Sequence, residues 1–254
     1  MITVVRLAGP LLAWPSPAKY RHRHTEPGPT LSAVQGLLAA AAGVTRGAPR
    51  PSWVQDAALA IRLDCPGSVL LDYHTINPAD RSRYRWLSSR DRSKVRTVVK
   101  ASGGDHQDTI STERYYRQDQ AVLVFIDDPD SAAYRALQHP TFTVFAGRKA
   151  CVLSFPFVLG QVAAPLEVAL GTVPTMASSE RQIEGVLFHA PTMLTKYKEP
   201  VLRPERPSGP VGEGYQMQAR HSVLVDPPRM ASWMDVLESL RPTAPEDKGD
   251  SSCG

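Results

Sequence analysis

The sequence predicts an α+β fold in which helices and strands alternate. Apolar residues recur at steps of three and four over residues 31–41, which is the period of a helix with one buried face. The run AVLVFI at residues 121–126 is continuously apolar, as in a central buried strand. Residues 2–7 are rich in β-branched side chains, which favour a strand. Together these segments predict helices packed on a sheet.

The first element is a strand over residues 2–7, which we expect to end at Gly9 and Pro10. A proline-rich, basic stretch then runs to residue 29 and is expected to form a loop. Thr30 opens the helix, and Gly43 stands where a C-terminal cap is expected.

The next segment contains a short helix and two strands. Residues 53–58 fit the helix, and residues 59–63 and 69–73 fit the strands. The polar segment from residue 74 to about 112 is irregular, and within it residues 95–99 fit a paired ribbon.

The buried strand 121–126 is followed by a further helix and strand. Asp128 as N-cap and Pro129 at the first helical position predict a helix that ends near residue 138. Residues 151–157 predict the next strand. The order is therefore β-α-β, an insertion, and β-α-β, which is the ferredoxin-like or RRM-like order.

The chain is expected to divide into three parts. Residues 1–160 form the RRM-like domain with an insertion at about 74–112. Residues 161–241 form a smaller C-terminal β-rich subdomain, in which residues 186–189 and 223–225 fit short strands and residues 198–214 a loop. Residues 242–254 are polar and fit a disordered tail.

Composition excludes several protein classes. The 254 residues are 42% hydrophobic, enough for a core. No apolar run reaches the 18 or so residues of a membrane helix, and no signal peptide is apparent. Three scattered cysteines argue against a disulfide framework. We therefore expect a cytoplasmic protein with no membrane association.

The strongest compositional signal lies in residues 81–100. Eight basic residues accompany one acidic residue, Asp91, so this window has a net charge of +7, against +4 for the whole chain. Arginines that contact phosphates and aromatic rings that stack on bases are typical of single-stranded nucleic-acid binding. A solvated charged loop is the other interpretation. The candidate residues are Arg81, Arg83, Tyr84, Arg85, Trp86, Arg90, Arg92, Lys94 and Arg96.

A second candidate site is the segment FAGRKAC at residues 145–151. Gly147 would let the backbone approach a ligand closely, and Arg148 and Lys149 would then reach phosphates. A turn between helix and strand with incidental basic residues explains the same pattern.

Signals for metal, cofactor or catalytic sites are weak. His22 and His24 have no cysteine or carboxylate at metal-ligand spacing, and the chain lacks HExxH, paired CxxC and P-loop motifs. We therefore expect no metal and no cofactor. His74, with Tyr73 beside it, is the candidate for metal-independent RNA cleavage by general acid–base chemistry. The run AVLVFID does not match the aromatic RNA-binding motif of conventional RRM domains.

Four ordered segments resemble a known family, the CasD-type subunits of the type I-E CRISPR effector complex Cascade. RLAGPLLAW at 6–14 resembles the family's N-terminal strand, and PTLSAVQGLLAAAAGVTRG at 29–47 its helix. DYHT at 72–75 resembles the start of the family's thumb insertion. FAGRKACVLSFPFVLG at 145–160 resembles its Leu-Gly-Arg-Arg-x-Cys-Pro-Leu segment.

The resemblance implies a non-catalytic RNA-binding subunit with an RRM-like core of the repeat-associated (RAMP) kind. Such subunits grip the 5′ handle of CRISPR RNA and cap the filament of backbone subunits in antiviral defence. The implied partners are CRISPR RNA, the backbone subunit and the large subunit, with target DNA reached through the complex. The thumb would contact RNA and the neighbouring backbone subunit.

The resemblance also assigns handle contacts to individual residues. Arg114 aligns with a handle-contacting arginine, and Arg148 and Lys149 fall on the family's basic pair. Phe145 replaces a tyrosine and keeps the stacking face without the hydroxyl group. The related type I-C counterpart cuts repeat RNA itself, so an endoribonuclease that uses His74, Tyr73 or His22 is the alternative.

Overall fold

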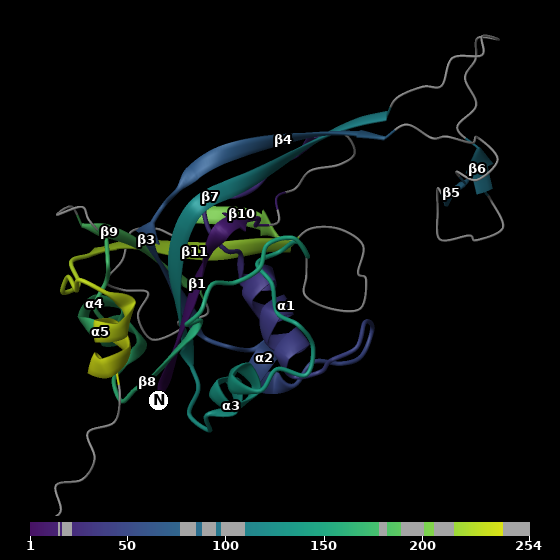
Figure 1. The fold of residues 1–254 in the computed structure, drawn as a ribbon. Coiled ribbons are helices and arrows are strands. Elements are labelled where there is room, and N and C mark those ends of the chain that lie inside the picture. Colours follow the sequence, from purple (N-terminus) through teal and green to yellow (C-terminus); the bar gives the residue numbers. More distant parts are fainter. Residues whose placement is uncertain are drawn as a thin grey trace, which may run out of the picture.

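The computed structural model describes residues 1–14, 16, 22–76, 85–87, 95–97, 110–177, 182–188, 201–205 and 216–240. Its centre is an antiparallel sheet covered by helices on both faces (Figure 1). The predicted mixture of helices and strands around one sheet is confirmed. The strands are β1 (Ile2–Leu12), β2 (His22–Arg23), β3 (Leu59–Cys65), β4 (Ser68–Ile76), β5 (Arg85–Leu87), β6 (Val95–Thr97), β7 (Ile110–Asp127), β8 (Val158–Val162), β9 (Ile183–Phe188), β10 (Val201–Glu205) and β11 (Gln216–Val225). The helices are α1 (Leu31–Ala41), α2 (Ser52–Gln55), α3 (Ala132–Gln138), α4 (Leu166–Thr172) and α5 (Trp233–Ser239).

The four central strands lie in the order β8-β1-β7-β3, and each neighbouring pair is antiparallel. Helix α1 connects β1 with β3, and α3 connects β7 with β8, so two β-α-β units interleave. β7 is central because its C-terminal half contains the apolar run at 121–126, of which residues 122–126 are buried on both faces of the sheet.

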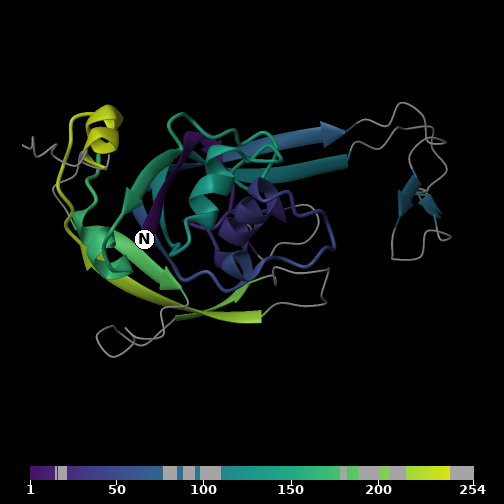
Figure 2. The same ribbon diagram turned by 90° about the horizontal axis from the view of Figure 1, so that it is seen from below.

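Helices cover the sheet from both sides, and each side has its own apolar cluster. Leu38 of α1 and Leu137 of α3 pack with Val122 and Val124 of β7 on one face. Leu170 of α4 packs on the other face, together with residues of α5. Figure 2 shows α1 to α3 grouped apart from α4 and α5.

The ends of α1 follow the local sequence signals. The Thr30 hydroxyl accepts a hydrogen bond from the Ala33 N–H, which caps the first turn. Gly43, one residue beyond the C-cap Ala42, has φ of +73°. A left-handed residue at this position is the common helix stop, and glycine adopts it without strain.

The C-terminal strands continue the same sheet. β9 pairs with β3, β11 pairs with β9, and β10 pairs with β11. The predicted boundary at residue 160 stays a prediction, and residues 242–254 lie outside the described residues. The predicted loop at 198–214 is wrong over β10. This edge strand tolerates Pro204 because an edge position does not need every N–H donor.

β1 is longer than predicted, since it continues through Gly9 and Pro10 to Leu12. Pro10 stands opposite Asp119, which has φ of +54° and lies between paired positions of the ladder. β8 pairs with β1 only over residues 2–5. No described strand therefore requires the N–H donor that proline lacks.

The expected strand at 151–157 is also wrong, because only Val152 makes a β-bridge there, to Phe145. The Cys151 N–H instead donates to the Arg148 carbonyl within the same loop, at 2.8 Å. Pro156 has no N–H with which to continue a ladder. The strand β8 starts only at Val158.

Helix α3 starts at Ala132, with Ser131 rather than Asp128 at the N-cap. Asp128 still caps the helix from a distance. Its carboxylate accepts hydrogen bonds from the N–H groups of Ala133 and Tyr134 at 3.1 and 2.9 Å, and from the Thr3 hydroxyl at 2.8 Å. The predicted capping function is correct and the predicted start is three residues early.

β4 and the first part of β7 form a long hairpin that extends away from the sheet (Figures 1 and 2). Its nine pairs run from Ser68–Gln118 to Ile76–Ile110. Between the strands along the chain, β5 and β6 pair with each other, and β6 covers residues 95–97 of the ribbon expected at 95–99. Among the described residues, no helix is long and apolar enough to cross a membrane.

Candidate nucleic-acid interface

The base of the β4–β7 hairpin is joined by the short strand β2, which pairs in parallel with β7. His22 lies opposite Glu113, and Arg23 lies opposite Arg114. Successive side chains of a strand point to opposite faces. This three-stranded ribbon therefore has two faces of different chemistry.

The first face carries the cations, and we call it the arginine face. Paired positions share a face, so Arg23, Arg114 and Asp72 belong to it. His74 lies on the same face and hydrogen-bonds the Asp72 carboxylate through Nε2. Arg148 reaches this face from the 145–152 loop. The members of the arginine face are Arg23, Asp72, His74, Arg114, Tyr116 and Arg148.

The Arg148 side chain makes three contacts within the protein. Its two terminal nitrogens donate hydrogen bonds of 3.0 Å to the main-chain carbonyl groups of Tyr115 and Arg23. Its guanidinium lies 4.5 Å from the ring centroid of Tyr116, a cation–π distance. These contacts connect the 145–152 loop to β7 and β2, so Arg148 positions both segments.

Gly147 allows this loop to reach β1. Its φ is +83°, and a Cβ there would lie 1.8 Å from the Ala13 carbonyl oxygen. The Ala13 N–H donates to the Ala146 carbonyl at 3.2 Å. The close approach expected of Gly147 is therefore made to the protein's own main chain.

The remaining predicted contacts near this loop differ in accessibility. Lys149 is exposed, and Phe145 is half-buried and bridged to Val152. Arg114 is half-buried, and its buried Nε has no hydrogen-bond partner among the described residues. The structure thus places Arg114, Arg148 and the 145–152 loop together.

Burial raises the pKa of the Cys151 thiol near the end of this loop, although Arg148 opposes that effect.

The second face carries rings and one carboxylate, and we call it the ring face. His22 Nδ1 lies 2.8 Å from Glu113 Oε2, and the Tyr115 hydroxyl donates to the same oxygen at 3.3 Å. The His24 and Tyr115 ring centroids are 4.6 Å apart. Leu71 and Tyr73 of β4 pair with Tyr115 and Glu113. The members of the ring face are His22, His24, Leu71, Tyr73, Glu113 and Tyr115.

The ring face changes the ionisation of one residue. Partial burial and the neighbouring Glu113 carboxylate raise the pKa of Tyr115 above its ordinary value. Tyr115 therefore holds its phenolic proton to higher pH than an ordinary tyrosine does, and its hydroxyl donates a hydrogen bond to Glu113.

The two candidates for acid–base catalysis are separated by the strand. Tyr73 and His74 are neighbours on β4, so their side chains lie on opposite faces of the ribbon. Within the described part of the chain, no group of three or more His, Cys, Asp or Glu side chains is arranged to hold a metal ion.

Most of the basic insertion cannot be placed in this site. Arg81, Arg83, Tyr84, Arg90, Arg92 and Lys94 lie outside the described residues. Arg85 and Trp86 belong to β5 and Arg96 to β6, with Trp86 opposite Arg96. These strands lie within the segment that the β4–β7 hairpin carries (Figure 1).

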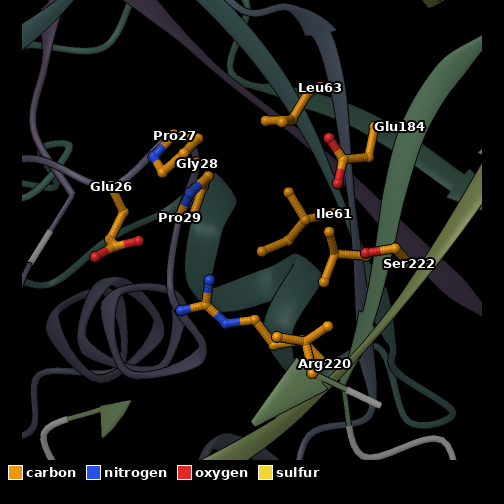
Figure 3. A pocket seen from close by; sticks show the side chains of 11 residues that line it. Glu26, Pro27, Gly28, Pro29, Ile61, Leu63, Glu184, Arg220 and Ser222 are labelled. Atoms are coloured by element: carbon orange, nitrogen blue, oxygen red, sulfur yellow. The ribbon is translucent and has the colours of Figure 1, made fainter. Parts of the chain in front are cut away.

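A pocket of about 180 Å³ lies apart from both faces, between the chain at residues 26–29 and strands β3, β9, β10 and β11 (Figure 3). Ile61 and Leu63 line its apolar side. Two carboxylates, Glu26 and Glu184, accompany the single guanidinium of Arg220. This balance does not suit a phosphate, and none of the predicted site residues lines the pocket.

Comparison with known proteins identifies the family. A family model described as CRISPR-associated protein, Cas5, matches residues 2–222. The chain belongs to the Cas5 family. The resemblance found in four short segments is thereby confirmed over most of the chain.

Individual relatives agree with this family. This Cas5 chain is 28% identical over 202 residues to the CRISPR system Cascade subunit CasD of Escherichia coli K12, covering 72% of this chain and 82% of the relative. A solved chain described as a CRISPR RNA-guided surveillance complex shares the fold, with a TM-score of 0.68 at 23% identity over 94% of this chain and 99% of that one. A second, described as a crystal structure of a Cas protein, has a TM-score of 0.63 at 26% identity over 91% and 100%.

Sequence reasoning named His22, His24 and Tyr73 but missed Leu71, Glu113 and Tyr115, and it did not bring these six residues of the Cas5 protein together as one face. Residues 74–112 were expected to be irregular, whereas β7 already begins at Ile110 and β4 ends at Ile76. The sequence STERYYR at 111–117 alternates only weakly between polar and aromatic residues. Glu113 and Tyr115 therefore gave no strand signal, and His24 had no identifiable partner.

Proposed function

We propose that this Cas5-family chain is the CRISPR RNA-binding subunit of a Cascade-type surveillance complex. In this role it grips the 5′ handle of the RNA and caps the filament of backbone subunits in antiviral defence. The observation that carries the proposal is the arginine face, where Arg23, Arg114 and Arg148 meet beside exposed Lys149. The relative from Escherichia coli is a Cascade subunit, which supports the same assembly.

The proposed binding mechanism combines charge neutralisation and stacking. Arg114, Arg148 and Lys149 neutralise handle phosphates. The half-buried Phe145 presents the accessible part of its ring for stacking on a base. Among the described residues, two of the five N–H donors of Arg148 bond main-chain carbonyl groups, and the proposal assigns the others to a ligand. The arginines of residues 81–100 extend the contact along the RNA and to the neighbouring backbone subunit. If about four phosphates are bound, log K falls with log salt at a slope of roughly −3.

The fold supports the assignment of an RRM-like RAMP core. Strands β8, β1, β7 and β3 belong to interleaved β-α-β units. In the proposal, the segment at 77–109 between β4 and β7 is the thumb, and residues 161–241 form the smaller C-terminal subdomain. The large subunit is a further partner, target DNA is reached through the complex, and the assembly is cytoplasmic.

The proposed subunit binds RNA without cutting it and uses no cofactor. The alternative is the endoribonuclease activity of the type I-C branch. The hydrogen bond between Asp72 and His74 favours it, because a carboxylate that orients an imidazole is a common arrangement for a general base. Tyr73, on the opposite face, does not join this pair.

One experiment tests both functions. The purified chain is incubated in EDTA with labelled repeat RNA from its own host, and with the same RNA lacking the 5′ handle. Native and denaturing gels then report binding and cleavage. We expect the handle-containing RNA to be shifted and intact, and the truncated RNA to bind more weakly. A discrete cut that is lost in His74→Ala would establish the nuclease instead.

A further inference from the structure

The ring face differs from the arginine face in both exposure and chemistry. Tyr73 is 57% exposed and Leu71 is 49% exposed, and the His22 side chain is 52% exposed. His24 is also exposed. Large apolar and aromatic side chains on one open sheet face suit a ligand that stacks.

The rings form a series rather than isolated side chains. The His22 and His24 rings lie within 18° of parallel, with centroids 6.4 Å apart. The His24 and Tyr115 rings are tilted by 31°, with centroids 4.6 Å apart. Tyr73 stands across from Glu113 on the neighbouring strand. A flat heterocycle that packs against His24 and Tyr115 therefore extends a ring surface that the protein has already ordered.

Charge decides which part of a nucleotide this face receives. Glu113 is the carboxylate at its centre, and it would repel a phosphate. Arg23, between His22 and His24 in the chain, points to the opposite face, where Arg114 and Arg148 lie. A single strand that bends around β2 can thus place its phosphates on the arginine face and its bases on the ring face.

We infer that the ring face is a stacking site for unpaired nucleobases of single-stranded RNA, with His24 and Tyr115 as the principal rings. The inference rests on the proposed RNA-binding function and adds a second surface to it. Glu113 orders the site by accepting hydrogen bonds from Tyr115 and His22. Base–aromatic stacking of this kind is tolerant of base identity, since every base has a π face.

The test measures RNA affinity and its salt dependence for the full chain, with labelled repeat RNA from its own host. The variants are His24→Ala and Tyr115→Ala. The controls are Tyr115→Phe, which keeps the ring, and Phe142→Ala, which removes a 44% exposed ring elsewhere. We expect each alanine variant at the ring face to weaken binding about 5- to 150-fold. The slope of log K against log salt stays constant, because neither substitution removes a lysine or an arginine.

A second measurement locates the contact directly and does not depend on the folding of Tyr115→Ala. Repeat RNA that contains 5-iodouridine is cross-linked to the wild-type chain by light, and the modified peptides are identified by mass spectrometry. We expect cross-links at His24, Tyr73 or Tyr115.

Three results would overturn the inference. RNA binding by both alanine variants at the wild-type level, with no cross-link on the ring face, would leave the RNA-binding function intact and remove this site. Wild-type RNA binding combined with failure of the variants to co-purify with partner subunits would assign the face to a protein contact. If the wild-type chain binds no RNA, the proposed function and this inference both fail.

Discussion

A guanidinium nitrogen of Arg148 donates a hydrogen bond of 3.0 Å to the main-chain carbonyl oxygen of Tyr115. The other terminal nitrogen reaches the Arg23 carbonyl at the same distance. The neighbouring Lys149 side chain is exposed. The two members of the basic pair therefore have different environments, although the sequence presents them as equivalent.

Arg148→Lys tests the two hydrogen bonds that the guanidinium donates to main-chain carbonyl groups. Lysine keeps the positive charge, but its single ammonium group lacks the planar fork that spans two carbonyl groups. We expect the free energy of unfolding to fall by about 1–2 kcal/mol, measured by urea titration. The slope of log K for RNA against log salt should persist, since the charge is retained. An unchanged urea midpoint would show that the two hydrogen bonds do not stabilise the loop.

Lys149→Ala is expected to change the salt dependence of RNA binding and to leave the stability of the fold unchanged, the reverse of Arg148→Lys. An exposed lysine contributes little to folding, so the melting temperature should not change. If Lys149 contacts a phosphate, the salt slope of RNA binding becomes less negative by about 0.7. Arg46→Ala, which removes an exposed cation beyond α1, is the matched control and should leave the slope unchanged. Equal slopes for Lys149→Ala and wild type would remove Lys149 from the interface.

Gly147→Ala tests the close approach of the loop to β1. The substitution places a Cβ in a left-handed conformation and within 1.8 Å of the Ala13 carbonyl oxygen, so main chain must move. We expect a loss of at least about 1–3 kcal/mol in unfolding free energy. Gly36→Ala in α1 is the control, because a Cβ there meets nothing within 4 Å. It should stabilise the helix by about 0.5–1 kcal/mol. Similar effects of the two substitutions would contradict the close packing of the loop against β1.

The ionisation of Tyr115 gives a pH-dependent prediction. Its pKa is raised in the folded chain, first by partial burial and then by Glu113. The folded state therefore holds the phenolic proton more tightly than the unfolded state. The resulting stability is complete below the ordinary tyrosine pKa of about 10 and is lost as the pH rises through the higher folded value. The difference in ultraviolet titration between wild type and Tyr115→Phe isolates this group. In Glu113→Gln we expect its pKa to move back toward the ordinary value, and no movement would exclude Glu113 as a cause.

A buried arginine on β3 pairs with a carboxylate of the same strand and also connects β3 to the end of α4. Arg62 is fully buried and donates to both Asp64 carboxylate oxygens, at 2.6 and 3.1 Å. It also donates to the carbonyl groups of Leu170, Val173 and Pro174. Asp64→Ala leaves the guanidinium charge buried without its partner and should cost about 3–5 kcal/mol in urea unfolding. Replacing both residues by leucine should cost less than Asp64→Ala alone, and a larger cost would show that the uncompensated charge is not the main penalty.

Elements specified by nearby residues were predictable from the sequence. The α1 start at Thr30 and the stop at Gly43 each depend on a hydrogen bond or a backbone angle within a few residues. The buried part of β7 was visible because six consecutive apolar residues need a core on both faces. Four short segments were likewise enough to identify the family from the sequence, and the family match over residues 2–222 confirmed it.

The tertiary structure alone decided the pairing of distant segments. β2 lies beside β7 across roughly ninety residues of chain, and only this register brings His22 to Glu113 and His24 to Tyr115. The passage of β1 through Pro10 likewise depends on which neighbouring strand needs a donor there. Caps and helix periods are local and can be read along the chain. Strand register is a contact between separated segments, so the sequence supplied the side chains of both faces and the fold determined which of them meet.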